Sequence, residues 1–372
     1  FNTASPLSGS LLPGRRVELQ GTVDGTAYTL WTGYLLRIQP TPDLRGVNAA
    51  ELEAIGPLGY LNQRQVDMPM VTSMLTGTAI GTILDQAGWG TARILDAGQT
   101  TLTRYWAHQA PTVMALRQVE ESEAGFILES KAGEVVFEDR HHRLASPHTA
   151  PVATFSDAAG ATLIYTGSQQ EDPLAGIFNI LRAQYRKFTV GASAVLWTLS
   201  DSGANSRIDP GGTRIWWASY PNPDSATDAV GVDAWTTPLS GTDWTANLDP
   251  SGTGRTAVTN KLTVAATAYG QRLKITLTNT GTAVAYLGLL QARGTPVTAQ
   301  DPVMVESVDA DSQDKYGERS YPSLAQFIPN SAEAQSWADL MKSIYKDPIP
   351  VLAITVPANR DNSHLTQAMS RD

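Results

Sequence analysis

The first 72 residues show the alternation of apolar and polar positions that is typical of β-strands. It runs through residues 15–43, on both sides of the dipeptide Asp24-Gly25. That dipeptide predicts a hairpin, because a tight turn between strands needs residues that adopt positive φ angles. Pro40 and Pro42 are expected to close the second strand, since proline has no backbone N–H for the ladder. We therefore predict a β-rich domain over residues 1–72.

From residue 73 the apolar spacing changes to that of helices, and we predict a small α/β domain over residues 73–143. A first helix over residues 76–88 has Thr78 as its expected N-cap and Gly88 as its stop. Its apolar face consists of Ile80, Ile83, Leu84 and Ala87.

A second helix and a hairpin complete this domain. Pro111 suits a first helical turn, and Gly125 is expected to end the helix. Val113, Leu116 and Val119 form its apolar stripe. Two short strands, FILES and EVVFED, then join through a turn at residues 131–133.

Short strands separated by Gly, Ser, Thr, Asp and Pro characterise residues 144–305. Such spacing indicates an antiparallel β-sandwich. A short helix is predicted before it, in PLAGIFNILRAQYR. The clearest strand patterns are AVLWTLS, TRIWWASY, KLTVAATAYG, RLKITLTNTG and VAYLGLLQARG.

Residues 306–372 are predicted to contain a helix and a strand. Asn330 and Glu333 fit a capping box, while Pro348 and Pro350 stop the helix before the strand VLAITVPAN. The apolar face of the helix comprises Trp337, Leu340, Met341 and Ile344. The predicted fold class is thus mainly β with an α+β insertion.

Composition narrows the classes of function. The chain has 372 residues, 42% of them hydrophobic and 17% charged, which suits two or three folded domains. A formal net charge of −9 disfavours binding to nucleic-acid phosphates, but it suits a surface past which DNA slides. Because there is no Cys, disulfides, cysteine zinc sites and thiol nucleophiles are excluded.

The sequence shows no recognisable targeting signal. No apolar run approaches the roughly 18 residues of a membrane helix, and no secretion leader is visible. The chain begins with Phe1 and ends at Asp372, so we expect it to be cut from a longer protein.

The stretch from Tyr105 to Arg140 concentrates carboxylates around a predicted helix end. Paired carboxylates catalyse acid–base reactions when their surroundings separate their pKa values. Solvent is the usual neighbour at a helix end, however, and we interpret these side chains as a solvated face. They are Glu120, Glu121, Glu123 and Glu129.

A group of histidines follows this stretch. His141, His142 and His148, beside Glu138 and Asp139, are residue types that bind divalent metals. Their spacing matches neither HExxH nor a facial triad, and we interpret them as surface or interface histidines. GxSxG and SxxK motifs are absent, and DPSGTGRTAVT lacks the lysine of a phosphate loop. We predict no catalytic residue, no cofactor and no metal site.

Tryptophan is concentrated in the predicted sandwich. Indole rings on an exposed sheet face can stack on sugars or bind a protein partner, whereas rings on the other face belong to the core. Trp216 and Trp217 are adjacent, so they must point to opposite faces of a strand. Core packing and a glycan or partner surface both remain open for these residues. The candidates are Trp216, Trp217, Trp235 and Trp244, with Trp197 as a fifth sandwich tryptophan.

The order of several segments resembles that of tail-tip or baseplate-hub proteins of long-tailed bacteriophages. NTASPLSGSLLPGRRVELQ followed by YTLWTGYLLRIQP resembles their first strands. The segment from ILDQAGW to FEDR is similar to their α/β domain, with Ala-Gly-Trp ending the first helix and Tyr-Trp preceding the second. KYGERSY and QSWADLMKSIYKDPIPVLAITVPAN resemble the return to the tube-like barrel. The part between VATFSD and QARGTPV resembles decoration domains in tail proteins of phages with actinobacterial hosts.

This resemblance implies a structural virion protein at the phage tail tip. Residues 1–72 and 306–372 would be tube-like β-barrel segments, and residues 144–305 a decoration domain. The expected assembly is a homotrimer that closes the tail tube and contacts a distal tail ring, the tape-measure protein and tail fibres. DNA would pass through its lumen without specific binding. No catalysis and no cofactor are implied.

Two other functions are compatible with the sequence. The tryptophans suit a carbohydrate-binding module that recognises a host surface glycan. A glycoside or peptidoglycan hydrolase needs a carboxylate pair, for which Glu121 and Glu138 are candidates without visible pocket context.

Overall fold

The computed structural model describes residues 11–23, 25–42, 48–90, 92–150, 154–158, 164–201, 203–221, 228–251, 256–322 and 327–355. Asp24 of the predicted hairpin turn lies outside these residues, as do parts of NTASPLSGSLLPGRRVELQ, VATFSD, DPSGTGRTAVT and VLAITVPAN. Within them the fold is mainly β, as predicted, with small helical insertions. Several separate sheets form, and no sheet of the described residues closes into a barrel. No helix there is long and apolar enough to span a membrane.

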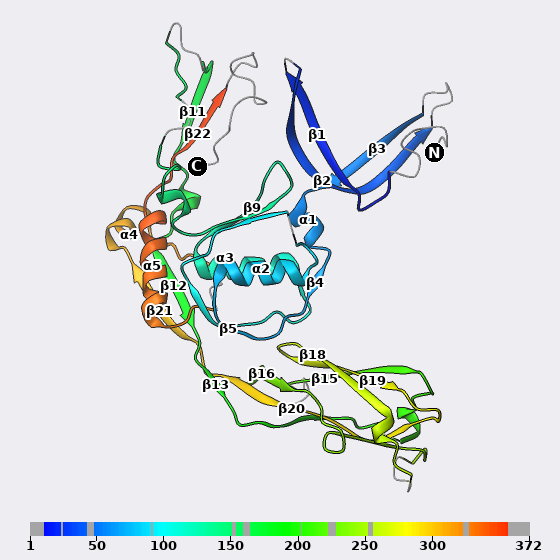
Figure 1. Ribbon diagram of the computed structural model, residues 1–372. Helices are drawn as coiled ribbons and strands as arrows, with labels where there is room; N and C mark the ends of the chain where they lie inside the picture. Colours follow the sequence, from blue (N-terminus) through cyan, green and yellow to red (C-terminus); the bar gives the residue numbers. More distant parts are fainter. Residues whose placement is uncertain are drawn as a thin grey trace.

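An antiparallel sheet in the order β1-β2-β3 projects from one end of the molecule (Figure 1). Val23 pairs with Thr26 across the predicted hairpin, which confirms that element. The pairing of β2 with β3 ends at Pro42, in agreement with the expected end of the strand. The strands are β1 (Arg16–Val23), β2 (Thr26–Pro42) and β3 (Asn48–Ile55).

The central body packs helices α2 (Thr76–Gln86) and α3 (Thr112–Glu123) around a continuous apolar core. The predicted stripes face the core, with Ile80, Ile83 and Leu116 fully buried, but Val113 is only partly buried. The sheet β6-β10-β9 covers one side, and the predicted hairpin forms its β9–β10 part. The other elements are α1 (Pro57–Leu61), β4 (Gln65–Val66), β5 (Val71–Leu75), β6 (Arg93–Leu95), β7 (Thr101–Tyr105), β8 (Ala110–Pro111), β9 (Phe126–Glu129) and β10 (Val135–Glu138).

The helix ends differ from the prediction in two places. Helix α2 begins at Thr76, so Thr78 lies inside the helix and is not its N-cap. Gly77 permits this start, because a Cβ there would lie 1.8 Å from the carbonyl oxygen of Asp96. Helix α3 ends through Ala124, which adopts the left-handed conformation (φ 56°) that was expected near Gly125. Gly88 follows α2 with φ 71°, as a stop signal should.

A third unit combines α5 (Ser331–Tyr345) with the sheet β12–β21. Asn330 caps α5 as predicted, since its side-chain oxygen accepts a hydrogen bond from the N–H of Glu333 at 3.0 Å. Met341 is buried and Tyr345 is partly buried against the same core, whereas Ile344 is 46% exposed. The other elements here are α4 (Ala310–Tyr316), β11 (Gly167–Glu171), β12 (Ile180–Tyr185), β21 (Val303–Val308) and β22 (Val351–Thr355).

The helix predicted in residues 173–186 is wrong. Strand β12 occupies that segment, preceded by a single 3₁₀ turn at Leu174–Gly176. Leu181, Ala183 and Tyr185 are buried at a spacing of two, and they pack in the core beneath α5. The alternating spacing determines the structure here, because α5 supplies an apolar surface for one face of the strand.

The sandwich consists of two antiparallel sheets that enclose one core. One sheet has the order β15-β19-β18. In the other, β13, β14, β16 and β17 all pair with the long strand β20. All five predicted strand patterns form strands. The bounds are β13 (Phe188–Val190), β14 (Ala194–Thr198), β15 (Thr213–Ser219), β16 (Ala229–Thr236), β17 (Trp244–Asn247), β18 (Leu262–Ala268), β19 (Arg272–Asn279) and β20 (Tyr286–Ala299).

The sandwich begins later than the predicted boundary at residue 144. Strands β11 and β12 precede it in sequence, yet they pair with β22 and β21, which follow it. The sandwich is therefore inserted between β12 and β21. Figure 1 shows it at the end of the molecule opposite to β1–β3.

Candidate functional site

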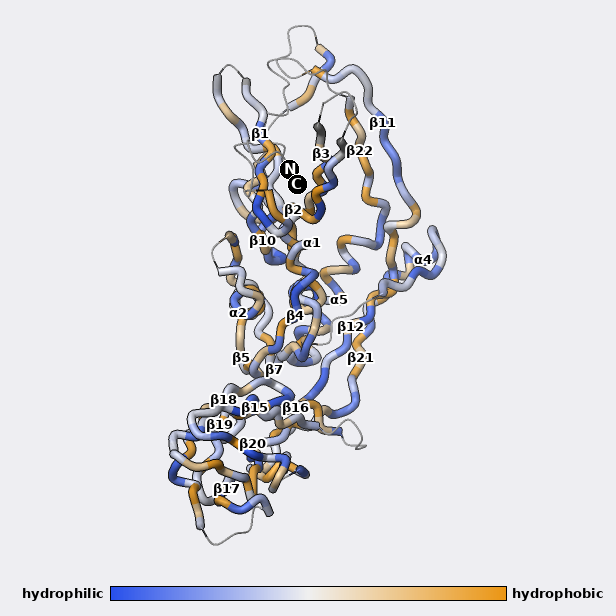
Figure 2. The backbone as a smooth tube through the Cα atoms, turned by 90° about the vertical axis from the view of Figure 1, so that its right-hand side faces the viewer, coloured by the Kyte–Doolittle hydropathy of each residue, from blue (hydrophilic) through white to orange (hydrophobic). Residues whose placement is uncertain are grey.

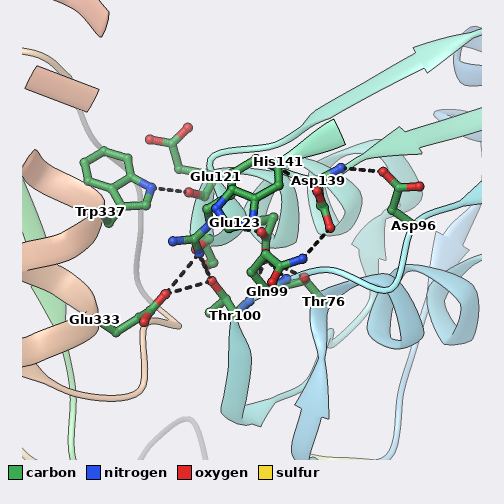
Figure 3. A network of polar contacts seen from close by, with 12 residues as sticks. Thr76, Asp96, Gln99, Thr100, Glu121, Glu123, Asp139, His141, Glu333 and Trp337 are labelled. Atoms are coloured by element: carbon green, nitrogen blue, oxygen red, sulfur yellow. Dashed lines mark hydrogen bonds and ion pairs between the residues drawn. The ribbon is translucent and has the colours of Figure 1, made fainter. Parts of the chain in front are cut away.

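Glu123 is a buried carboxylate at the centre of a polar network (Figure 3). It accepts hydrogen bonds from Thr76 Oγ1 at 2.7 Å and from the backbone N–H groups of Gln99 and Thr100 at 3.0 and 2.8 Å. Helix α3 ends at Glu123 and thereby directs the carboxylate into the body. The prediction of a solvated glutamate is therefore wrong at this position, because three donors replace water around the charge.

Arg140 connects this network to α5. Its guanidinium lies 3.0 Å from the carboxylate of Glu123 and 3.0 Å from that of Glu333, and it also contacts Thr100 Oγ1. In addition, Trp337 Nε1 donates a hydrogen bond of 2.8 Å to the carbonyl oxygen of Glu121. Figure 3 shows these contacts between α5 and the end of α3. The arrangement fixes two structural units to each other.

The other glutamates of this stretch also have structural partners. Glu129 Oε1 accepts a hydrogen bond of 2.6 Å from the N–H of Leu58 at the start of α1. Glu120 accepts one of 2.6 Å from the N–H of Ile127 and pairs with Arg117. Both carboxylates satisfy backbone donors that would otherwise need water.

The histidines form part of a second network, beside the first. His142 Nδ1 lies 2.7 Å from Asp96 Oδ2, and the rings of His142 and His148 are 4.3 Å apart. Burial by itself raises the pKa of Asp139. The hydrogen bonds that Asp139 accepts from Gln99 and from the backbone of His141 outweigh this effect, so its pKa lies below the ordinary value. Within the described ranges, no group of three or more His, Cys, Asp or Glu is placed to hold a metal ion.

A shallow pocket of about 350 Å³ lies between α2 and β6. Its charged residues include Arg93, whose guanidinium donates to Asp85 and to the carbonyl oxygen of Gly81. Neither Glu121 nor Glu138 lines it. The pocket therefore does not bring together the carboxylate pair that a hydrolase of this chain would use.

The sheets β1–β2–β3 and β11–β22, here called the two thin sheets, lie at the same end of the molecule in both views (Figures 1 and 2). In the described part of the chain, β1, β3, β11 and β22 each pair with one strand only. Large apolar side chains are exposed on both sheets: Leu19 (57%), Leu52 (48%) and Leu352 (63%). Such sheets lack the covered apolar face that normally stabilises a few strands in water.

The first thin sheet is attached firmly to the central body through the middle of β2. Tyr34 on β2 stacks on Tyr60 of α1 at a centroid distance of 4.3 Å, and Trp89 packs edge-on against Tyr34. Leu35 is buried beside them. The sheet is therefore held at its base while its ends remain uncovered.

The candidate tryptophans separate into core and surface residues. Trp244 is buried in the sandwich core at 2% exposure, so it cannot contribute to an exposed surface. Trp216 and Trp235 are partly buried and pack against the same core, as does Trp197. Trp217 points to the other face and is 41% exposed. Of the four candidates, Trp217 is therefore the one whose ring can offer a surface to a ligand or partner.

Comparison with known proteins finds structural similarity over less than half of this chain. No family model matches the chain, and no curated protein matches it. Part of the fold is similar to the 43 kDa tail protein of prophage MuSo2 from Shewanella oneidensis, with a TM-score of 0.32 and 13% identity over 46% of this chain and 49% of that one. The tail protein from Neisseria meningitidis MC58 gives a TM-score of 0.32 and 12% identity over 45% and 51%. The chain spans about half the length of each tail protein.

Proposed function

We propose that this chain is a structural subunit of a bacteriophage tail, a tail-tip hub protein that assembles as a homotrimer. The observation that carries the proposal is the pair of thin sheets. Both have open edges and exposed leucines, and both lie at one end of a well-packed body. Neighbouring copies that pair with these edges would satisfy the backbone groups and cover the apolar side chains.

The resemblance of the segment order to phage hub proteins supports the same role and supplies the number of copies. In this proposal the thin sheets of three subunits form the wall of a tube that closes the tail. A distal tail ring, the tape-measure protein and tail fibres are the expected neighbours, and DNA passes through the lumen without specific binding. A net charge of −9 suits that passage, because like charges repel.

The proposed role needs no catalysis and no cofactor. The buried charges of the central body have partners that join structural units: Glu123 binds Arg140, and Arg140 binds Glu333. These ion pairs stabilise the body to which the thin sheets are attached. In this proposal the described part of the chain is a scaffold and not an enzyme.

The oligomeric state tests the proposal. We expect the purified chain to sediment as a trimer, and electron micrographs to show threefold rings. Leu352→Asp on β22 and Leu19→Asp on β1 should each shift the trimer to monomer, because a charge would be placed in the contact between copies. Leu239→Asp, at a sandwich position with the same 57% exposure as Leu19, should leave the trimer unchanged. An unaltered chain that stays monomeric at every concentration, both free and in virions, would contradict the proposal.

A further inference from the structure

The outer face of the sheet β15–β19–β18 differs in charge from the rest of the molecule. Alternate residues of these strands, such as Leu273, Ile275 and Leu277, point into the sandwich core. The residues between them form the outer face, which is mostly hydroxyl-bearing and carries Arg272 and Lys274. None of the three strands contains Asp or Glu, although the chain has 36 acidic and 27 basic residues. The three strands therefore contribute only positive charge to this face, and of the two cations Arg272 is paired with Asp67 of the central body.

Trp217 lies on this face in a fixed position. The guanidinium carbon of Arg272 is 4.2 Å from the centre of its ring, and the Tyr269 ring is 5.9 Å away. Arg272 in turn contacts Asp67 of the central body. Because these contacts immobilise the indole while 41% of the residue stays exposed, a ligand that stacks on the ring would lose little conformational entropy of the protein.

Polar groups surround the ring at positions set by strand pairing. Lys274 is the direct cross-strand partner of Trp217, with its Nζ 5.8 Å from the ring centre, and Thr267 is the partner of Lys274 on the third strand. No carboxylate of the described residues forms an ion pair with Lys274. Thr276 lies two residues further along β19, about 7 Å away along the strand. The aromatic ring of Trp217, the ammonium group of Lys274 and a row of hydroxyl groups thus lie on the same face.

We infer that this face binds an acidic saccharide, with a sugar ring stacked on Trp217 and its negative group near Lys274. A sugar has an apolar C–H face and a rim of hydroxyls, which match the indole and the threonines. Ligand sites of this kind combine apolar area with a few placed polar groups. A protein partner fits less well, because lysine, which this face carries at Lys274, is depleted in protein interfaces. This sheet lies on the side of the sandwich next to the central body, and the thin sheets lie at the other end of the molecule (Figure 1). Trp217 remains 41% exposed, and subunit assembly through the thin sheets would not cover it.

Binding to a glycan array that contains uronic, sialylated, phosphorylated, sulfated and neutral saccharides tests the inference. The intact chain should bind one or more acidic saccharides. Trp217→Ala should weaken that binding at least about fivefold, since stacking of a ring on an aromatic side chain contributes about 1–3 kcal/mol by alanine substitution in nucleic-acid complexes. Lys274→Gln should also weaken it, and Lys274→Arg should retain it.

Phe126→Ala is the matched control. Phe126 is likewise exposed, at 42%, and Arg143 lies 4.2 Å above its ring, but it belongs to the central body. This variant should bind as the intact chain does. Circular dichroism verifies the fold of every variant, and Lys274→Glu, a change at a partly exposed position, serves if Trp217→Ala does not fold.

Three results would overturn the inference. The first is that the intact chain binds no acidic saccharide on the array. The second is that Trp217→Ala binds unchanged. The third is that polyglutamate, an acidic polymer without sugar rings, competes equally well for the face, which would indicate general charge attraction. A trimeric chain that binds no saccharide refutes this inference alone, and a monomer that binds one refutes the proposed assembly alone.

Discussion

Glu123 is fully buried, so the stability of its charge depends on the protein groups that face it. Glu123→Gln would remove one partner of Arg140 and place an amide N–H₂ group among three donors. Breaking a buried ion pair in this way costs about 3–5 kcal/mol. We expect the free energy of unfolding of the central body to fall by that amount in denaturant titrations.

Glu306→Gln is the comparison for this prediction. Glu306 also pairs with an arginine, Arg182, but both side chains are 44% exposed. Exposed pairs contribute about 0–1 kcal/mol, so this variant should unfold almost as the parent does. An equal loss of unfolding free energy in the two variants would show that the network around Glu123 stabilises the body no more than an exposed ion pair does.

At the scale of single residues the sequence predicted apolar positions better than polar ones. The helix stripes that contain Ile80 and Leu116 are buried as expected, because spacing alone defines a helix face. The burial of Glu123 could not be foreseen. It depends on Arg140 and Glu333, and the approach of residue 333 to residue 140 is a property of the tertiary structure. The same holds for Trp217, whose strand neighbour Lys274 lies far along the chain.

Among the elements, α5 allows a direct test of a prediction made from its sequence. The Asn330 side chain accepts a hydrogen bond from the N–H of Glu333, which would otherwise lack a partner within the helix. Asn330→Ala should lower the free energy of unfolding by about 1 kcal/mol, and Asn330→Asp should change it little, because aspartate caps equally well. Thermal unfolding of both variants provides the measurement. A loss as large for Asp as for Ala would contradict the capping role.

Elements defined by their own periodicity were predicted, and elements defined by distant partners were not. The sandwich strands and the β9–β10 hairpin have local signals in alternation and turn residues. Strand β12 has a sequence that permits a helix, and β21, more than a hundred residues later, decides its state by pairing with it. The sandwich begins later than predicted for the same reason, because β11 and β12 precede it in sequence but pair with β22 and β21, which follow it.

Across the whole molecule, the sandwich is joined to the central body by contacts that leave little room for movement. The N–H of Gly270 donates to the carbonyl oxygen of Met68 at 2.7 Å, and Arg104 pairs with Asp233 at 3.1 Å. A Cβ at Gly270 would lie 2.7 Å from the Cβ of Trp106. A side chain at this glycine must therefore displace one unit from the other, without entering either core.

Gly270→Val should loosen the orientation of the sandwich while both cores remain folded. The chain has no Cys, so thiols introduced at Met114 on α3 and Thr263 on β18 can carry spin labels at unique sites. We expect a narrow distribution of label distances in the parent and a clearly broader one in Gly270→Val. Gly176→Val is the control, because a Cβ there has no neighbour within 4 Å, and it should leave the distribution narrow. A distribution as narrow for Gly270→Val as for Gly176→Val would mean that the junction does not hold the two units in one orientation.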